Sequence, residues 1–177
     1  MSTPMIGIGD TECSFLNVYI ANRPPLDEYS SLEQLKPLNK HEITFIAQQT
    51  GNHWRKIFNV FAKFMFSYFT RQKIQLEASS WQDYREKNLL QLGSNLRLLF
   101  TNPNLNENVV HVIMGKQYAI DLGYHEDLHT GMLRLDSDFV IWPEKKLIVC
   151  PYFDYRQLSN IKIDRLIDLV ISINQVK

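Results

Sequence analysis

The sharpest chemical pattern in this sequence is the segment His125-Glu126-Asp127-Leu128-His129, which has the HExxH spacing of zinc proteases. On a helix, two histidines four residues apart share one face and can bind zinc, while the glutamate polarises a water molecule. Such a helix must be held rigidly, and Gly123 and Gly131 leave only a short segment between them. The surroundings therefore favour a solvated polar loop over a metal site, and no metal or other cofactor is expected.

The other histidines and the cysteines indicate structural roles. His111 lies inside an apolar run, where a hydrogen-bonded core histidine is the usual explanation. His41 and His53 fall in the first turns of predicted helices, and Cys150 ends a predicted strand with no basic neighbour to activate it. Gly7-Ile8-Gly9 lacks the third glycine and the preceding strand of a nucleotide-binding loop. These residues therefore give no sign of a catalytic nucleophile or a phosphate loop.

Polar and aromatic residues follow the ends of predicted strands, and they form the candidate ligand-binding site. Asn22 and Arg23 come after the first strand, and Tyr152, Asp154 and Arg156 come after the last one. In open α/β sheets, ligands bind beyond the carboxyl ends of the strands. This mixture of rings, amide, carboxylate and guanidinium suits a planar polar ligand such as a nucleobase. The alternative is a well-packed loop in which the tyrosines fill space and Arg156 is an ion-pair partner.

The periodicity of apolar residues predicts the elements that position these side chains. Apolar, β-branched runs predict strands at 15–21, 109–114, 139–142 and 147–150. Helical periods predict helices at 39–49, 52–69, 81–99 and 116–122 and one from about residue 159 to the end, and Asn39 with Glu42 forms a capping-box pattern. Strands separated by helices predict a single α/β domain over residues 1–177, with a mixed, mostly parallel central sheet and helices on both faces.

The predicted helix from Asn52 to Phe69 is apolar over most of its circumference. Its main apolar stripe is Trp54, Ile57, Phe58, Phe61, Met65 and Tyr68, and its opposite stripe is Arg55, Lys56, Asn59 and Lys63. Three further rings spread beyond the apolar stripe: Phe64, Phe66 and Phe69. Because exposed apolar patches are uncommon in monomers, we expect a homodimer through this helix. The alternative is that the helices predicted at 39–49 and 81–99 cover it within one subunit.

The composition limits the classes of partner. The chain has 19 Lys and Arg against 19 Asp and Glu, so its formal net charge is zero. Proteins that hold nucleic acid through phosphates usually carry a basic excess, so this balance disfavours generic nucleic-acid binding but allows a local basic patch. Two cysteines are too few for a disulfide framework. With no signal-peptide pattern and no apolar stretch of about 18 residues, a cytoplasmic protein without a membrane partner is expected.

In the order and pattern of its elements, the chain resembles the uracil-DNA glycosylase superfamily. Residues 109–123 resemble the strand-Gly-helix unit of that family, and the strand at 147–150 with its proline loop resembles the region of the family's His-Pro-Ser loop. Asn22-Arg23-Pro24 falls where the family has its first catalytic loop. Arg23 replaces the family's water-activating carboxylate or asparagine, and Cys150-Pro151-Tyr152 lacks the expected histidine. The resemblance therefore implies a glycosylase-like fold without ordinary uracil excision.

The chain also resembles a family of small bacterial proteins that have no assigned function. Three functions follow from these observations, in order. The first is a non-catalytic or diverged glycosylase-like domain that binds a nucleobase, a nucleotide or nucleic acid at the carboxyl ends of its strands. The second is a protein–protein interaction module that uses the aromatic helix. The third is a zinc-dependent hydrolase acting through HExxH.

Overall fold

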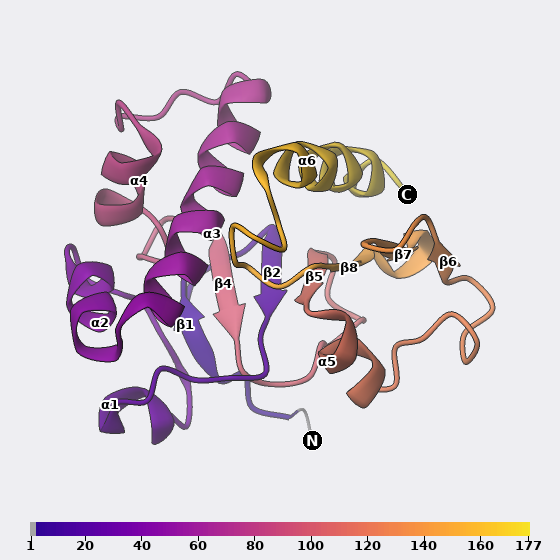
Figure 1. The fold of residues 1–177 in the computed structure, drawn as a ribbon, viewed down its shortest axis with the longest axis horizontal. Coiled ribbons are helices and arrows are strands. Elements are labelled where there is room, and N and C mark those ends of the chain that lie inside the picture. Colours follow the sequence, from indigo (N-terminus) through magenta and orange to yellow (C-terminus); the bar gives the residue numbers. More distant parts are fainter. Residues whose placement is uncertain (1–2) are drawn as a thin grey trace.

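The computed structural model describes residues 3–177, and its strands form one sheet of eight (Figure 1). The strands are β1 (Gly7–Gly9), β2 (Leu16–Tyr19), β3 (Leu35–Lys36), β4 (Leu96–Leu99), β5 (Val110–Met114), β6 (Leu133–Arg134), β7 (Val140–Trp142) and β8 (Leu147–Cys150). Their order across the sheet is β3-β1-β4-β2-β5-β8-β7-β6. The central strands β4, β2, β5 and β8 are parallel, while β1 joins β4, and β7 joins β8, in antiparallel pairs. The predicted mixed, mostly parallel sheet is confirmed.

Helices cover both faces of the sheet, as the sequence predicted. They are α1 (Asp27–Ser30), α2 (Glu42–Thr50), α3 (Asn52–Arg71), α4 (Trp81–Lys87), α5 (Lys116–Asp121) and α6 (Asn160–Asn174), with a 3₁₀ turn at Pro143–Lys145. The larger core lies between the sheet and α2, α3, α4 and α6, and the smaller core packs α5 against the other face. None of these helices, within residues 3–177, combines the length and the apolar character that a membrane span requires.

Helix α3 is the centre of the larger core. It contacts α2 and α4 along one side and α6 along the other (Figure 1). Phe64 is fully buried, and the rings of Phe66 and Phe69 pack on Tyr84 of α4 with centroid distances of 6.3 and 6.0 Å. The apolar surface that suggested a homodimer is therefore covered within the subunit, which removes the reason for expecting one. What α3 leaves uncovered is its polar stripe.

The predicted helix at 81–99 is wrong in its second half. Ser80 caps α4 as predicted, accepting a hydrogen bond from the backbone N–H of Asp83 at 3.2 Å, but the helix ends at Lys87. Leu90 and Asn95 then adopt positive φ angles of 59°, which a right-handed helix does not allow. Residues 96–99 form β4, the strand between β1 and β2. Their leucines fitted a helical period, but pairing with both neighbouring strands decides the conformation.

Strand β1, which the sequence did not predict, depends on two glycines. A Cβ atom on Gly7 or Gly9 would collide with the backbone of β4, at the carbonyl oxygens of Leu98 and Leu96. Only glycine permits this approach, and the two strands pair antiparallel from Gly7 opposite Leu99 to Gly9 opposite Arg97. The Gly-Ile-Gly segment is thus part of the sheet, in agreement with its rejection as a nucleotide loop.

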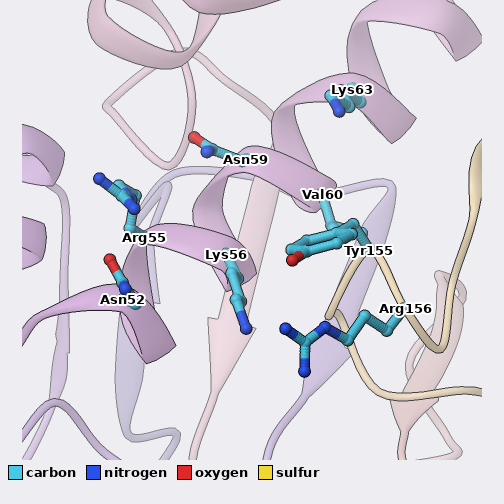
Figure 2. A pocket seen from close by; sticks show the side chains of 8 residues that line it. All are labelled: Asn52, Arg55, Lys56, Asn59, Val60, Lys63, Tyr155 and Arg156. Carbon is cyan, nitrogen blue, oxygen red and sulfur yellow. The ribbon is translucent and has the colours of Figure 1, made fainter.

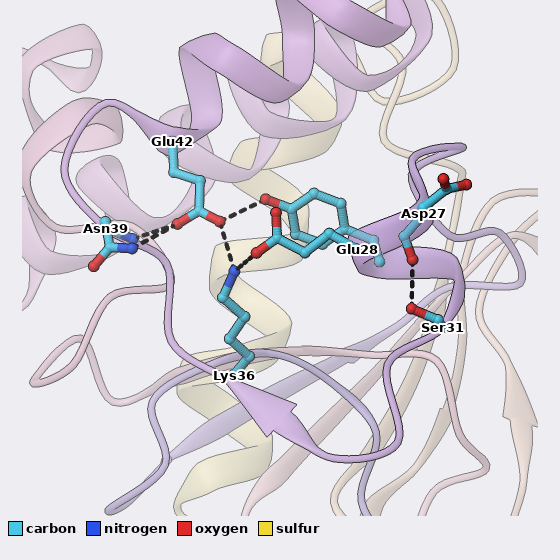
Figure 3. A network of polar contacts seen from close by, with 7 residues as sticks. Asp27, Glu28, Ser31, Lys36, Asn39 and Glu42 are labelled. Atoms are coloured by element: carbon cyan, nitrogen blue, oxygen red, sulfur yellow. Dashed lines mark hydrogen bonds and ion pairs between the residues drawn. The ribbon is translucent and has the colours of Figure 1, made fainter.

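The predicted capping pattern at the start of α2 holds, and Glu42 extends it into a larger network (Figure 3). One carboxylate oxygen of Glu42 accepts the backbone N–H of Asn39 at 2.7 Å. The other accepts the Tyr29 hydroxyl at 2.5 Å and the Lys36 ammonium at 3.0 Å. Burial raises the pKa of Glu42, but these hydrogen bonds outweigh it and lower the pKa overall. Glu42 therefore ties α1 and β3 to the first turn of α2.

A buried polar network lies on the opposite face of the central strands. His111 on β5 is fully buried, and its Nε2 lies 3.3 Å from the carbonyl oxygen of Glu107. A carbonyl only accepts, so Nε2 carries the proton and Nδ1 accepts the Tyr19 hydroxyl at 2.7 Å. Burial lowers the pKa of His111 to about 4. The sequence-based interpretation of His111 as a hydrogen-bonded core histidine is confirmed.

Neutral His111 makes the fold sensitive to mild acid. The folded-state pKa of about 4 lies below the ordinary value of 6.5, so as pH falls below 6.5 the unfolded chain takes up the proton first. We expect the free energy of unfolding to fall by on the order of 2 kcal/mol between pH 7 and pH 5 from this residue. Denaturant titrations across that range measure the slope, and the His111→Phe variant should show a flatter one. Equal slopes in both proteins would contradict the assignment.

Candidate functional site

The carboxyl ends of β2, β5 and β8 meet at one edge of the sheet, because these strands are parallel neighbours. The first turn of α3 lies at the same edge, where His53 Nε2 is 2.9 Å from the Tyr152 hydroxyl and the two rings stack at 5.8 Å. Burial raises the pKa of Tyr152, the charge of Asp154 adds to the increase, and a hydrogen bond with Asn22 opposes it. Asn22, Tyr152 and Asp154 therefore gather at the strand ends, together with His53.

Arg23 does not join this group. Its Nη1 donates to the backbone carbonyls of Tyr29, Ser30 and Leu32 at 3.3, 3.1 and 3.0 Å, and its guanidinium lies over the ring of Phe100. These contacts satisfy the carbonyl groups around the end of α1, which a short helix leaves without partners. Arg23 is thus committed to holding the loop after β2.

Asp154 fixes the loop that follows β8 against α3. Its Oδ1 accepts the backbone N–H of Arg156 at 2.9 Å, and its Oδ2 lies 3.4 Å from Lys56 Nζ. The backbone hydrogen bond from Arg156, followed by the interaction with Lys56, lowers the pKa of Asp154. The carboxylate therefore stays charged at neutral pH, and it directs Tyr155 and Arg156 onto the uncovered side of α3.

A cavity of about 430 Å³ lies where this loop meets the polar stripe of α3 (Figure 2). It is lined by Asn52, Arg55, Lys56, Asn59, Val60, Lys63, Tyr155 and Arg156. Four of these side chains are cationic and none is acidic. Among residues 3–177, only Lys56 of the four has a carboxylate at ion-pair distance. We call this cavity the α3 pocket.

Tyr155 gives the α3 pocket an exposed aromatic face. Its side chain is 53% exposed, although large apolar rings are usually buried. Lys56 Nζ lies 5.2 Å and the Arg156 guanidinium 5.7 Å from the centre of its ring. An aromatic face with cations around it can stack a planar ring and hold an attached anion, and Asn52 and Asn59 supply amides that can hydrogen-bond to the ring's edge.

Sequence reasoning found one side of this pocket and missed the other. It selected Arg156, which lines the pocket, and Asp154, which holds the loop in place. It described Arg55, Lys56, Asn59 and Lys63 only as the polar stripe of a helix. The missing signal was the separation of about 100 residues between stripe and loop, which no local pattern spans.

The comparisons with known proteins point to a family without a function. Residues 6–171 match the model of a family described as a family of unknown function, DUF6942. The chain belongs to this family. No curated protein and no solved structure matches the chain. DUF6942 membership agrees with the expected uncharacterised family, while the resemblance to uracil-DNA glycosylases gains no support.

The HExxH segment is a loop in the structure, as its glycines predicted. Residues 124–130 contain turns and no helix. His125 Nδ1 accepts the backbone N–H of Asp127 at 3.1 Å, whereas His129 Nε2 lies 2.8 Å from the carbonyl oxygen of Gly123. Glu126 forms an ion pair with Arg134. Within residues 3–177, no three His, Cys, Asp or Glu side chains are placed to hold a metal ion.

Separate roles for the two histidines predict separate mutational effects. His129 also packs on the Trp142 ring at a centroid distance of 4.7 Å, so His129→Ala should lower the free energy of unfolding by about 1–2 kcal/mol. His125→Ala should change it by less than about 0.5 kcal/mol. Thermal melts with and without zinc measure both effects. A zinc-dependent rise in melting temperature that either substitution abolishes would instead establish a metal site.

Proposed function

We propose that this protein binds a nucleotide in the α3 pocket, with the base on Tyr155 and the phosphate among the surrounding cations. The observation that carries the proposal is the concentration of Arg55, Lys63 and Arg156, none of them ion-paired within residues 3–177, around one exposed ring. The chain as a whole has no net charge, so its general composition does not account for this excess. Unpaired cations in a cavity favour an anionic ligand, and the ring favours one with a planar group.

The size of the pocket supports the same ligand class. A volume of about 430 Å³ lies within the range of roughly 300–1,000 Å³ typical of small-molecule sites. The residues predicted at the strand ends take different parts in this proposal. Arg156 contacts the ligand, while Asp154 and Tyr152 hold its loop on α3 through Lys56 and His53. Asn22 supports Tyr152 from the loop after β2.

Titration with thymidine monophosphate tests this proposal, with binding followed by calorimetry. Tyr155→Ala should weaken binding about fivefold or more, because stacking of a base on an aromatic ring is worth about 1–3 kcal/mol. Tyr155→Phe keeps the ring and should retain most of the affinity. Arg55→Gln and Arg156→Gln should each weaken binding about two- to fivefold, as expected for exposed charge pairs.

Lys73→Gln is the matched charge control. Lys73 is exposed just beyond the carboxyl end of α3, and it lines none of the hollows along that helix. Its substitution should leave the affinity unchanged. The proposal fails if thymidine monophosphate does not bind at millimolar concentration, or if Tyr155→Ala binds as tightly as Lys73→Gln.

A further inference from the structure

The α3 pocket continues into two further hollows along the same helix. One, of about 330 Å³, lies beyond Lys63 among α3, α4 and α6 and includes Phe66 and Trp81. The other, of about 260 Å³, lies between α2 and α3 and includes Arg55, Asn59 and Arg85. Lys63 lines both the α3 pocket and the first hollow, and Arg55 and Asn59 line both the pocket and the second. The three form one continuous depression, which we call the α3 groove.

The groove contains the same local arrangement twice. Lys56 and Arg156 lie 5.2 and 5.7 Å from the centre of the Tyr155 ring. Lys63 and Arg85 lie 5.0 and 5.7 Å from the centre of the Trp81 ring. Each ring is thus accompanied by one lysine of α3 and one arginine of a neighbouring segment. Aromatic platforms with cations beside them, repeated along a groove, are how proteins bind successive units of a single strand of nucleic acid.

The acidic residues of the groove do not cancel this charge. Asp154 is paired with Lys56, and Asp164 is paired with Arg71 at 2.7 Å. Glu86 is paired with Arg85 at 2.8 Å. Each carboxylate therefore has its own cation. Arg55, Lys63 and Arg156 are left, within residues 3–177, to meet phosphates.

The spacing of the two rings favours an unpaired strand. Lys56 and Lys63, which accompany the rings, are seven residues apart on α3, or about 10 Å along its axis. Successive phosphates in one strand of duplex DNA rise only about 3.4 Å along the axis. Adjacent stacked bases would not reach both rings, whereas splayed bases with a nucleotide between them would. Bases in a duplex have no free face to offer.

We propose, as an inference that rests on the nucleotide site proposed above, that the ligand is a single-stranded nucleic acid that lies along the α3 groove. One base stacks on Tyr155 and a second stacks on Trp81. Lys63, placed between the two platforms, neutralises the phosphate of the connecting nucleotide, while Arg55 and Arg156 neutralise phosphates toward the strand-end side of the groove.

Anisotropy titrations compare thymidine monophosphate, as a competitor, with fluorescein-labelled dT8, an eight-residue uridine oligomer and a duplex of equal length. We expect an oligomer to bind at least tenfold more tightly than the monophosphate and the duplex to bind more weakly than the single strands. Trp81→Ala should weaken oligomer binding about five- to tenfold and leave monophosphate binding unchanged, and Trp81→Phe should restore most of the loss. The two oligomers distinguish DNA from RNA as the natural source.

The salt dependence gives a second measurement that does not require a change at Trp81. Three neutralised phosphates predict a slope of about −2 for the logarithm of the binding constant against the logarithm of salt, since each contributes about −0.7. Lys63→Gln should make that slope less steep by about 0.7, and Lys73→Gln should not change it. This variant keeps the inference testable if Trp81→Ala does not fold.

The outcomes separate the two proposals. If the monophosphate binds but an oligomer binds no more tightly, or Trp81→Ala and Lys63→Gln have no effect on oligomers, the strand is excluded and the nucleotide site stands. If neither the monophosphate nor an oligomer binds, the proposed function itself is wrong. If polyphosphate or an abasic oligomer of equal charge competes as well as dT8, the groove binds polyanions in general and the nucleic-acid assignment is overturned.

Discussion

The packing of α3 against the sheet is the constraint on which the rest of this structure depends. Ten of its 20 residues are buried, and they bring seven large apolar or aromatic side chains (Trp54, Ile57, Phe58, Phe61, Phe64, Met65 and Tyr68) into the larger core. Truncating one such ring, as in Phe61→Ala, typically costs about 3–5 kcal/mol. Because α2, α4 and α6 occupy the flanks of α3, the helix has one free face, and that face carries its cations.

This arrangement explains why a chain without net charge has a cationic groove. The apolar residues of α3 must face the core, so Arg55, Lys56 and Lys63 are placed together by the helical period. Two contacts then position the loop after β8: His53 holds Tyr152, and Lys56 holds Asp154. Tyr155 is left exposed as a result, next to the stripe of α3. A structural requirement of the core thus creates the surface to which we assign binding.

The two faces of the sheet have different chemistry. On the α3 face the core is apolar, and polar groups lie outside it along the groove. On the other face, Asn17 and His111 are fully buried between central strands, and the side-chain oxygen of Asn17 has no hydrogen-bond partner within residues 3–177. An unpartnered buried polar atom is unfavourable, and the stability of this region depends on His111 remaining neutral. The acid sensitivity of the fold and its proposed binding therefore reside on opposite faces.

The sequence by itself determined the elements whose signal is local. The apolar period of α3, the β-branched runs of β2, β5 and β8, the glycine that closes α5 and the capping residues Ser80 and Glu42 are all visible within short windows. Tertiary structure decided the rest. Leu96–Leu99 is a strand because it pairs with β1 and β2, and Arg23 left the candidate site because carbonyl groups of α1 hold it. The groove joins residues 52–63 to residues 81–85 and 155–156, and their convergence depends on strand order and helix packing. A window along the chain records periodicity, but not which distant segment will complete a strand or cover a helix.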